Sequence, residues 1–164
     1  MGNPINLHGT CVALSCARHC AGLLLRGAPG SGKSSLALQL IDQSGFGAGS
    51  ADPVNVELVS DDQVLLEDVN GILTASAPPD TEGLLEVRGT GIIRVGKTRS
   101  PVRLDMVIAH ADAADMDRLP DPAVIELCGQ TLPLHKIDFS APPAAAQVRC
   151  LALIQWGLLS LSNS

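Results

Sequence analysis

The chain has 164 residues, of which 46% are hydrophobic and 17% charged; this is the size and composition of one ordinary domain with a buried core, and it excludes a chain disordered throughout. Aromatic residues make up only 2% and the formal net charge is −6, so we expect neither base stacking nor a basic nucleic-acid-binding surface. The core must therefore be built from aliphatic side chains, and no nucleic-acid partner is predicted.

Strands and helices are predicted to alternate along the chain. Apolar runs at 10–14 and 22–25 indicate two strands, and a helix should follow over 33–41 and end at the glycine-rich segment 45–49. Further strands are expected at 56–59, 84–87, 92–95 and 102–109. A terminal helix should follow Pro142-Pro143, with a buried stripe of Val148, Leu151, Ala152 and Leu159. This order is typical of an α/β fold whose middle is richer in strands than a doubly wound sheet.

The segment Gly27-Ala28-Pro29-Gly30-Ser31-Gly32-Lys33-Ser34 matches the phosphate-binding pattern G-x-x-x-x-G-K-[ST] in full. Its glycines allow backbone angles at which successive N–H groups converge on an anion, and the helix that follows directs its positive end to the same place. Lys33 is expected to neutralise charge on the β- and γ-phosphates, and the Ser34 hydroxyl to hold magnesium. A strand before the segment and a helix after it are the context that this motif requires, so we predict nucleotide binding by all eight residues.

Three acids are candidates for metal binding and proton transfer. Asp61 and Asp62 follow the predicted strand 56–59, whose carboxyl end should face the ligand crevice of an α/β sheet; a hydrophilic turn is the alternative. Adjacent side chains at a strand end point in different directions, so the two acids need not share a role. Glu86 interrupts an apolar run, so we expect it to be buried and to meet a cation, either Arg88 on the same face of the strand or magnesium.

The four histidines form no recognisable catalytic or metal-binding pattern with one another. His8 stands before the first predicted strand, and periodicity gives no reason to choose it over His110 or His135. His19 lies between Cys16 and Cys20, but the spacing lacks the paired C-x2-C signature of structural zinc sites. No G-x-S-x-G nucleophile elbow occurs either, so residue patterns alone leave the choice of a catalytic histidine open.

The five cysteines are irregularly spaced, and the first seven residues have neither the charged nor the apolar region of a secretory leader. Reduced thiols in a cytoplasm are the simplest interpretation. The apolar stretch from Leu151 to Leu161 is interrupted by Gln155 and Gly157 and is too short to span a bilayer. We therefore predict a cytoplasmic protein with no membrane partner.

Taken in order, these pieces resemble the catalytic domain of the HPr kinase/phosphorylase family, bacterial serine kinases that act on the phosphocarrier protein HPr. The resemblance runs from His8-Gly9 through the phosphate-binding segment and Leu58-Val59-Ser60-Asp61-Asp62 to Asp117-Arg118. Its most family-specific part is Glu86-Val87-Arg88-Gly89-Thr90-Gly91-Ile92-Ile93. The chain is most similar to the short alphaproteobacterial forms, so residues 1–164 are interpreted as one catalytic domain without the N-terminal domain of other members.

The resemblance implies a P-loop fold similar to the nucleotide-binding core of phosphoenolpyruvate carboxykinase, and hexamers like those of members with the extra domain. It implies that Lys33 and Ser34 bind phosphate and magnesium and that Glu86 completes the magnesium site. Asp62 would accept the proton in the kinase reaction and donate it in any reverse reaction. His8 and Arg118 match a catalytic histidine and a catalytic arginine of the family.

The chain departs from the family pattern in its last part. The segment P-V-x-x-G-R-N, which the family ties to dephosphorylation, is not recognisable around residues 132–138, so the phosphorolytic activity lacks this support. The chain also ends soon after Trp156, where full-length members continue in helices that help to hold HPr. We expect an ATP- and Mg²⁺-dependent protein serine kinase that acts on HPr. The alternatives are a small-molecule kinase or NTPase that uses the same loop, and a non-catalytic nucleotide-sensing module.

Overall fold

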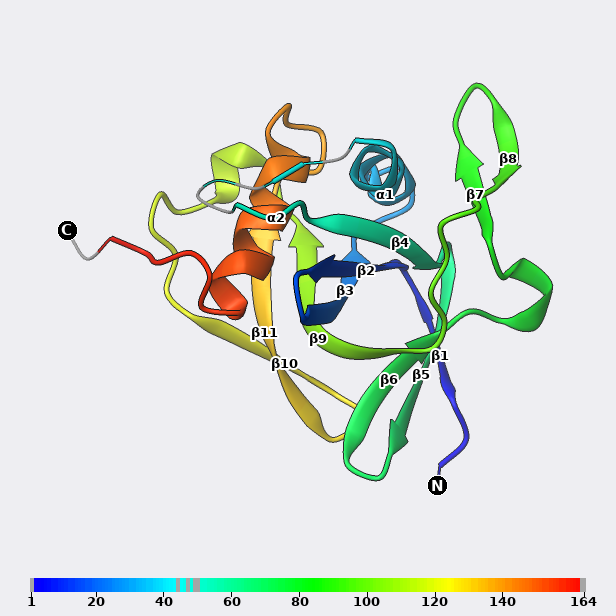
Figure 1. Cartoon of the computed structure of the whole chain (residues 1–164). Helices are drawn as coiled ribbons and strands as arrows, with labels where there is room; N and C mark the ends of the chain where they lie inside the picture. The colour runs from blue at the N-terminus through cyan, green and yellow to red at the C-terminus, as the bar shows by residue number, and fades with distance from the viewer. Residues whose placement is uncertain (1, 44, 47, 49–50, 163–164) are drawn as a thin grey trace.

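The computed structural model describes residues 2–43, 45–46, 48 and 51–162. Figure 1 shows the elements in chain order. They are β1 (Ile5–His8), β2 (Thr10–Cys16), β3 (His19–Arg26), α1 (Lys33–Asp42), β4 (Asn55–Ser60), β5 (Gln63–Val69), β6 (Ile72–Ser76), η1 (Pro79–Thr81), β7 (Leu84–Val87), β8 (Gly91–Arg94), β9 (Val102–His110), η2 (Ala113–Asp115), β10 (Ala123–Leu127), β11 (Gln130–Ile137) and α2 (Ala144–Gln155).

A nine-stranded sheet forms the body, in the order β1-β5-β6-β9-β3-β2-β4, with β11 beside β9 and β10 beside β11. Strand β9 runs parallel to both β3 and β11, and the other pairs are antiparallel. The carboxyl ends of the three parallel strands therefore meet at one edge, which is where ligands bind in α/β sheets. Strand β3 leads from this edge directly into the phosphate-binding segment.

Both faces of the sheet are covered by aliphatic side chains. In β3, Leu23 and Leu25 point to the face on which α1 and α2 pack, whereas Leu24 points to the other face. The helices lie beside one another over the first face (Figure 1) and contribute Leu36 and Val148, among others. Full burial of such a side chain contributes about 1.5–3 kcal/mol, so the alternation fixes which way each strand faces.

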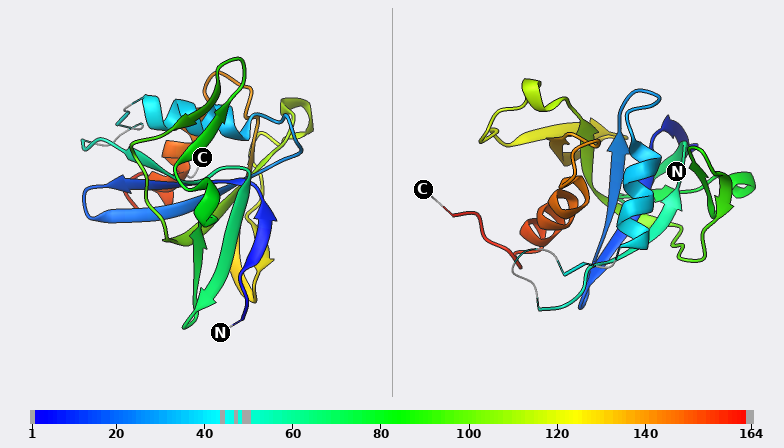
Figure 2. Two further views of the ribbon diagram at one scale, coloured as in Figure 1. Left: turned by 90° about the vertical axis from the view of Figure 1, so that its right-hand side faces the viewer. Right: turned by 90° about the horizontal axis from the view of Figure 1, so that it is seen from above.

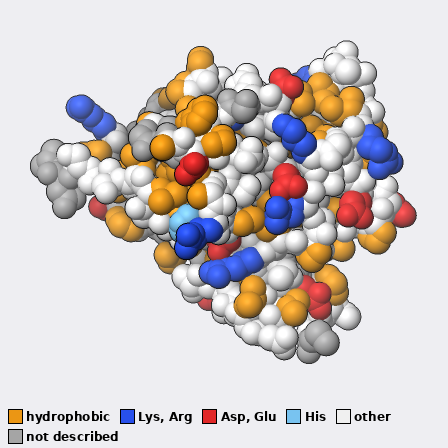
Figure 3. Space-filling model, viewed as in Figure 1, with side chains coloured by type: hydrophobic (Ala, Val, Ile, Leu, Met, Phe, Trp, Pro, Cys, Tyr) orange, Lys and Arg blue, Asp and Glu red, His pale blue; other side chains and the backbone are white. Residues whose placement is uncertain are grey.

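Strands β7 and β8 form a separate two-stranded hairpin that projects from the body, as both further views show (Figure 2). Leu85 of β7 is fully buried in the core under α1, and it attaches the hairpin beside the start of that helix. On the face shown in Figure 3, Lys and Arg side chains are interspersed with Asp and Glu side chains. In the described part of the chain, no helix is long and apolar enough to cross a membrane.

The predicted α/β class and each predicted element are confirmed, with boundaries that differ by a few residues. The predicted alternation of strands and helices is wrong, because in the described part of the chain the strands β4 to β11 follow one another without an α-helix between them. The strands β1, β5, β6, β10 and β11 were not predicted, because polar residues break their apolar alternation. Helix α1 ends at Asp42, before the expected break, of which residues 44, 47 and 49 lie outside the described part. The predicted stripe of α2 is partly wrong: the helix ends before Leu159, and Leu153 is buried more fully than Leu151.

Candidate functional site

The phosphate-binding segment has a backbone that only glycine adopts without strain. Gly32 caps α1 with a φ of 100°, in the left-handed region. A Cβ placed on Gly27 would lie 2.4 Å from the Ser31 Oγ atom, so the two ends of the loop approach each other closely. No side chain caps the N-terminus of α1, and its first turn contains no acid. The backbone N–H groups of this turn are thus left for an anionic ligand.

Lys33 is folded back onto the loop that precedes it. Its side chain is 6% exposed, and Nζ donates to the carbonyl oxygens of Gly27 (2.8 Å) and Ala28 (3.1 Å). Burial lowers the pKa of Lys33, an effect that the nearby Asp61 and Asp62 carboxylates oppose. The ammonium group therefore lies at the Gly27–Ala28 end of the loop, against these two carbonyl oxygens.

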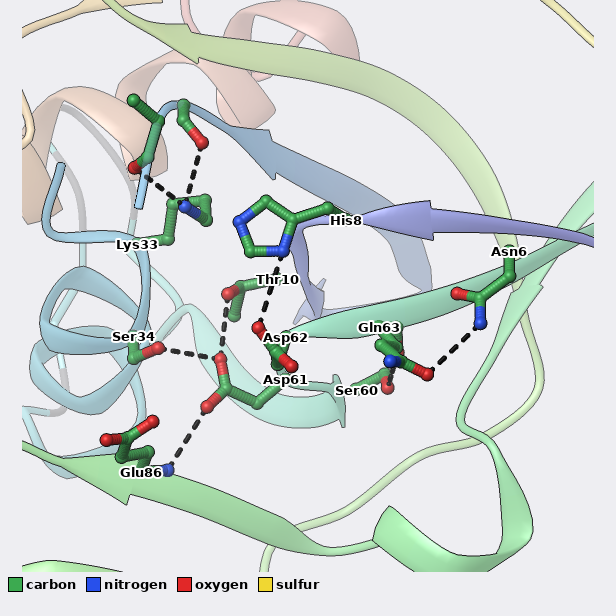
Figure 4. Close-up of polar contacts among 12 residues, drawn as sticks. Asn6, His8, Thr10, Lys33, Ser34, Ser60, Asp61, Asp62, Gln63 and Glu86 are labelled. Carbon is green, nitrogen blue, oxygen red and sulfur yellow. Dashed lines mark hydrogen bonds and ion pairs between the residues drawn. The ribbon is translucent and has the colours of Figure 1, made fainter. Parts of the chain in front are cut away.

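Asp61 is the centre of a hydrogen-bond network behind the loop (Figure 4). Its Oδ1 atom accepts hydrogen bonds from Ser34 Oγ (2.7 Å) and Thr10 Oγ1 (2.8 Å), and Oδ2 accepts one from the backbone N–H of Glu86 (3.1 Å). The residue is 6% exposed. A single buried carboxylate thus joins strand β2, helix α1 and the β7–β8 hairpin, and it fixes the Ser34 hydroxyl at the mouth of the loop.

Asp62 points away from Asp61, toward solvent and His8. Its φ of 67° lies in the left-handed region, which aspartate tolerates better than most residues, and this turn separates the two neighbouring carboxylates. His8 Nδ1 lies 3.4 Å from Asp62 Oδ1, with side-chain exposures of 48% and 70% (Figure 4). His8 precedes the strand predicted from Thr10, but it also lies in a strand that was not predicted. His8 is the last residue of β1, and pairing of β1 with β5 places it opposite Gln63.

The expectation that Glu86 is buried is also wrong. In the two-stranded hairpin only one face is covered, so Leu85 is buried while the Glu86 side chain is exposed and lines the cleft. Among the described residues no ion pair joins Glu86 to Arg88. Arg88 instead lines the same cleft, and its Nη2 atom lies 3.9 Å from the position that a Cβ would take on Gly30.

These side chains surround one cleft of about 310 Å³. Its lining residues are His8, Thr10, Pro29, Gly30, Gly32, Lys33, Ser34, Ser35, Asp62, Glu86 and Arg88. The structure thus brings together the predicted loop, both predicted metal-binding residues, and two predicted catalytic residues from other elements. It does not bring in Arg118, which is exposed between η2 and β10 and does not line the cleft.

Sequence reasoning assigned no role to Thr10 and left the role of Asp61 open. Thr10 carries no motif, and its contact with Asp61 comes from the neighbouring strands β2 and β4. Asp61 and Asp62 were recognised as a pair, but the pattern could not say which one is buried. The sequence contained one sign that Arg88 lies at the site: the glycine-rich turn that follows it marks the end of a hairpin, beside the acid Glu86.

The donor set fits magnesium. Among the described residues no group of three or more His, Cys, Asp or Glu side chains is arranged to hold a metal ion. Magnesium beside a nucleotide does not require one, because it is held by one or two protein oxygens together with phosphates and waters. The Ser34 hydroxyl, already oriented by a buried carboxylate, and the exposed Glu86 carboxylate supply oxygens of this kind.

Comparison with known proteins gives a consistent result. The family model described as HPr Serine kinase C-terminal domain matches residues 1–138. An HPr kinase/phosphorylase of Clostridium beijerinckii is 37% identical over 122 residues, which cover 69% of this chain and 35% of that protein. An HPr kinase/phosphorylase of Clostridium botulinum is 33% identical over 147 residues, which cover 84% of this chain and 43% of that protein. The chain thus spans less than half the length of these relatives.

Among solved structures, the HPr(Ser) kinase/phosphatase of Coxiella burnetii has a similar fold. It superposes with a TM-score of 0.72 and 23% sequence identity, over 93% of this chain and 99% of that chain. At this identity the likeness concerns the fold alone. It agrees with the P-loop kinase fold implied by the sequence resemblance.

Proposed function

The chain belongs to the HPr serine kinase C-terminal domain family, and from this premise we propose that it transfers the γ-phosphoryl group of ATP to a serine hydroxyl of the phosphocarrier HPr, with magnesium. The observation that carries the proposal is the His8–Asp62 pair at the edge of the phosphate cleft. In this proposal residues 1–164 act as one catalytic domain.

The phosphates bind to the uncapped N–H groups at the start of α1 and to the loop around them. Lys33 Nζ exchanges the carbonyl oxygens of Gly27 and Ala28 for β- and γ-phosphate oxygens, which places the γ-phosphate at that end of the loop. Arg88, opposite Gly30, adds a second positive charge from the hairpin. These contacts hold the nucleotide and offset the charge that develops during transfer.

Asp62 is the proton acceptor. It is exposed and lies in the cleft, so an incoming serine hydroxyl can reach its carboxylate. As the serine oxygen bonds to the γ-phosphorus, its proton passes to Asp62, the bond from that phosphorus to the β–γ bridging oxygen breaks, and ADP leaves with the electron pair. His8, next to this carboxylate, orients it toward the acceptor.

Ser34 and Glu86 hold magnesium in this proposal, and Asp61 positions Ser34 through the 2.7 Å hydrogen bond. When bound, the ion neutralises phosphate charge and orients the β- and γ-phosphates. Arg118 remains a catalytic candidate through its sequence match alone, and the exposed segment that carries it must approach the cleft for this role. We further propose that the enzyme is cytoplasmic and forms hexamers. We propose no phosphorolytic reaction, because residues 132–138 lack the segment that the family ties to dephosphorylation.

The test is transfer of label from γ-labelled ATP to purified HPr. We expect labelled HPr with the unmodified chain, labelling slowed at least about 100-fold with Lys33→Ala or Asp62→Asn, and unchanged labelling with Asp80→Asn, a control acid exposed outside the cleft. Hydrolysis of ATP or labelling of a small molecule with HPr untouched would instead identify a small-molecule kinase or NTPase. Tight ATP binding without any turnover would identify a nucleotide sensor.

A further inference from the structure

A second pocket, of about 480 Å³, adjoins the phosphate cleft. It lies at the carboxyl ends of the parallel strands β3 and β9, where Arg26 and His110 contribute to its lining. The half-buried side chains of Leu7, Ile125 and Leu134 form its apolar part, from β1, β10 and β11 respectively. This pocket could not be predicted from the sequence, because the three strands that form its apolar part, β1, β10 and β11, were not predicted.

The two cavities have one lining residue in common, His8. His8 lines both, so the second pocket begins on the other side of the residue that contacts Asp62. Gly27 belongs to the lining of the second pocket and to the loop around the phosphates. A molecule bound in the second pocket is therefore next to the proton acceptor.

The position of Lys33 decides which end of the nucleotide faces this pocket. Its ammonium group, which in phosphate-binding loops takes the β- and γ-phosphates, lies at the carbonyl groups of Gly27 and Ala28. The γ-phosphate end of the cleft is therefore the Gly27 end, which borders the second pocket. This places the pocket on the acceptor side of the reaction, away from the nucleoside.

The apolar surface continues out of the pocket. Ile5 lies two residues before Leu7 on β1, so both side chains are on the same face of the strand, and Ile5 is 52% exposed. The charged and titratable side chains of the pocket are Arg26, His8 and His110, without an acid. An apolar wall that extends to the surface suits a protein segment, whereas a sugar or another small polar acceptor would leave its hydroxyls unpaired against Leu7, Ile125 and Leu134.

We propose that this pocket binds an apolar side chain of the protein acceptor, next to the serine that is phosphorylated, and so determines which serine is presented to Asp62. The inference rests on the proposed function and adds the chemical class of the acceptor segment. Loss of an apolar fit of this kind changes discrimination between substrates by about 10- to 200-fold.

The experiment compares two tryptophan variants of neighbouring residues on β10. Ile125→Trp fills the pocket, whereas Val124→Trp adds the same bulk to a side chain that is 66% exposed and alternates to the opposite face of the strand. Steady-state phosphorylation of HPr gives kcat and KM, fluorescence titration with an ATP analogue gives nucleotide affinity, and thermal unfolding reports the fold. If Ile125→Trp does not fold, Leu7→Ser removes apolar surface from the opposite wall and is measured in the same way.

We expect the pocket variant to raise the KM for HPr at least tenfold with nucleotide affinity within about twofold, and the Val124 variant to match the unmodified chain. An unchanged KM in the pocket variant overturns the inference, as does a loss of nucleotide affinity equal to the loss for HPr, which would assign the pocket to the nucleoside. No labelling of HPr by the unmodified chain overturns the proposed function itself.

Discussion

The neighbouring acids Asp61 and Asp62 should respond in opposite ways to the same substitution by asparagine. Asp61 is buried and accepts three hydrogen bonds, so it should matter for the free energy of unfolding. Asp62 is exposed and makes one ion pair with His8, so it should matter for the reaction. The pair therefore separates a role in folding from a role in chemistry within two consecutive residues.

The magnitudes follow from the contacts. Hydrogen bonds to a charged group contribute about 1.5–3 kcal/mol each and neutral ones about 0.5–1.5 kcal/mol. In Asp61→Asn the amide oxygen must stay toward the Glu86 N–H, which can only donate. The new NH2 group then faces the Ser34 and Thr10 hydroxyls, which must rotate to accept from it, and all three bonds lose their charged acceptor. Because asparagine is neutral, the variant no longer buries a charge, which offsets part of this cost. We expect the free energy of unfolding to fall by about 2 kcal/mol, which corresponds to a fall in Tm of about 4–8 °C.

For Asp62→Asn the expected loss of stability is below about 1 kcal/mol, since surface ion pairs contribute no more than this and asparagine also tolerates a positive φ. Its phosphoryl-transfer rate should fall by about 10²- to 10⁴-fold, as for the loss of a general base. Thermal unfolding and HPr labelling of both variants test this. Equal Tm shifts, or an Asp61→Asn protein as stable as the unmodified chain, would refute the reasoning.

Three further outcomes are expected. Glu86→Gln should weaken ATP binding about tenfold in the presence of Mg²⁺ and leave both the Mg²⁺-free affinity and the fold unchanged, as paired titrations will show. If the variant and the unmodified chain bind ATP equally well with Mg²⁺, Glu86 does not hold the metal. Burial lowers the pKa of Lys33, so between its folded and unfolded pKa values the folded chain holds fewer protons than the unfolded chain, and the free energy of unfolding should rise with pH there. In the same window the affinity for ATP should fall, because Lys33 loses its charge. Lys33→Arg should abolish the fall in ATP affinity, and a fall that persists in this variant excludes Lys33 as its source. Arg88→Ala should lower kcat/KM about 10- to 100-fold, with partial recovery in Arg88→Lys, whereas the exposed Arg94→Ala on β8 should behave as the unmodified chain; parallel losses in both alanine variants would indicate a general effect of hairpin charge.

Local patterns were predictable because the physics behind them is local. The phosphate loop needs its glycines at fixed places, so Gly27 to Ser34 could be read directly, and the start of α1 at Lys33 follows from them. Glu86 shows the limit of such patterns. An acid in an apolar run predicts burial when a strand is covered on both faces, but β7 lies in a hairpin with one covered face. The pattern of residues within a strand does not show whether one face of that strand or both are covered.

The sequence by itself determined that a phosphate-binding loop pattern lies at 27–34, that acids follow β4, and that strands stand before and after helix α1, because each depends on residues close together in the chain. Only the tertiary structure decided that Asp61 is the buried partner of Ser34 and Thr10, and that Asp62 faces His8. The physical reason is that these contacts join residues many positions apart, through the pairing of β1 with β5 and of β2 with β4, and no short segment encodes such pairing.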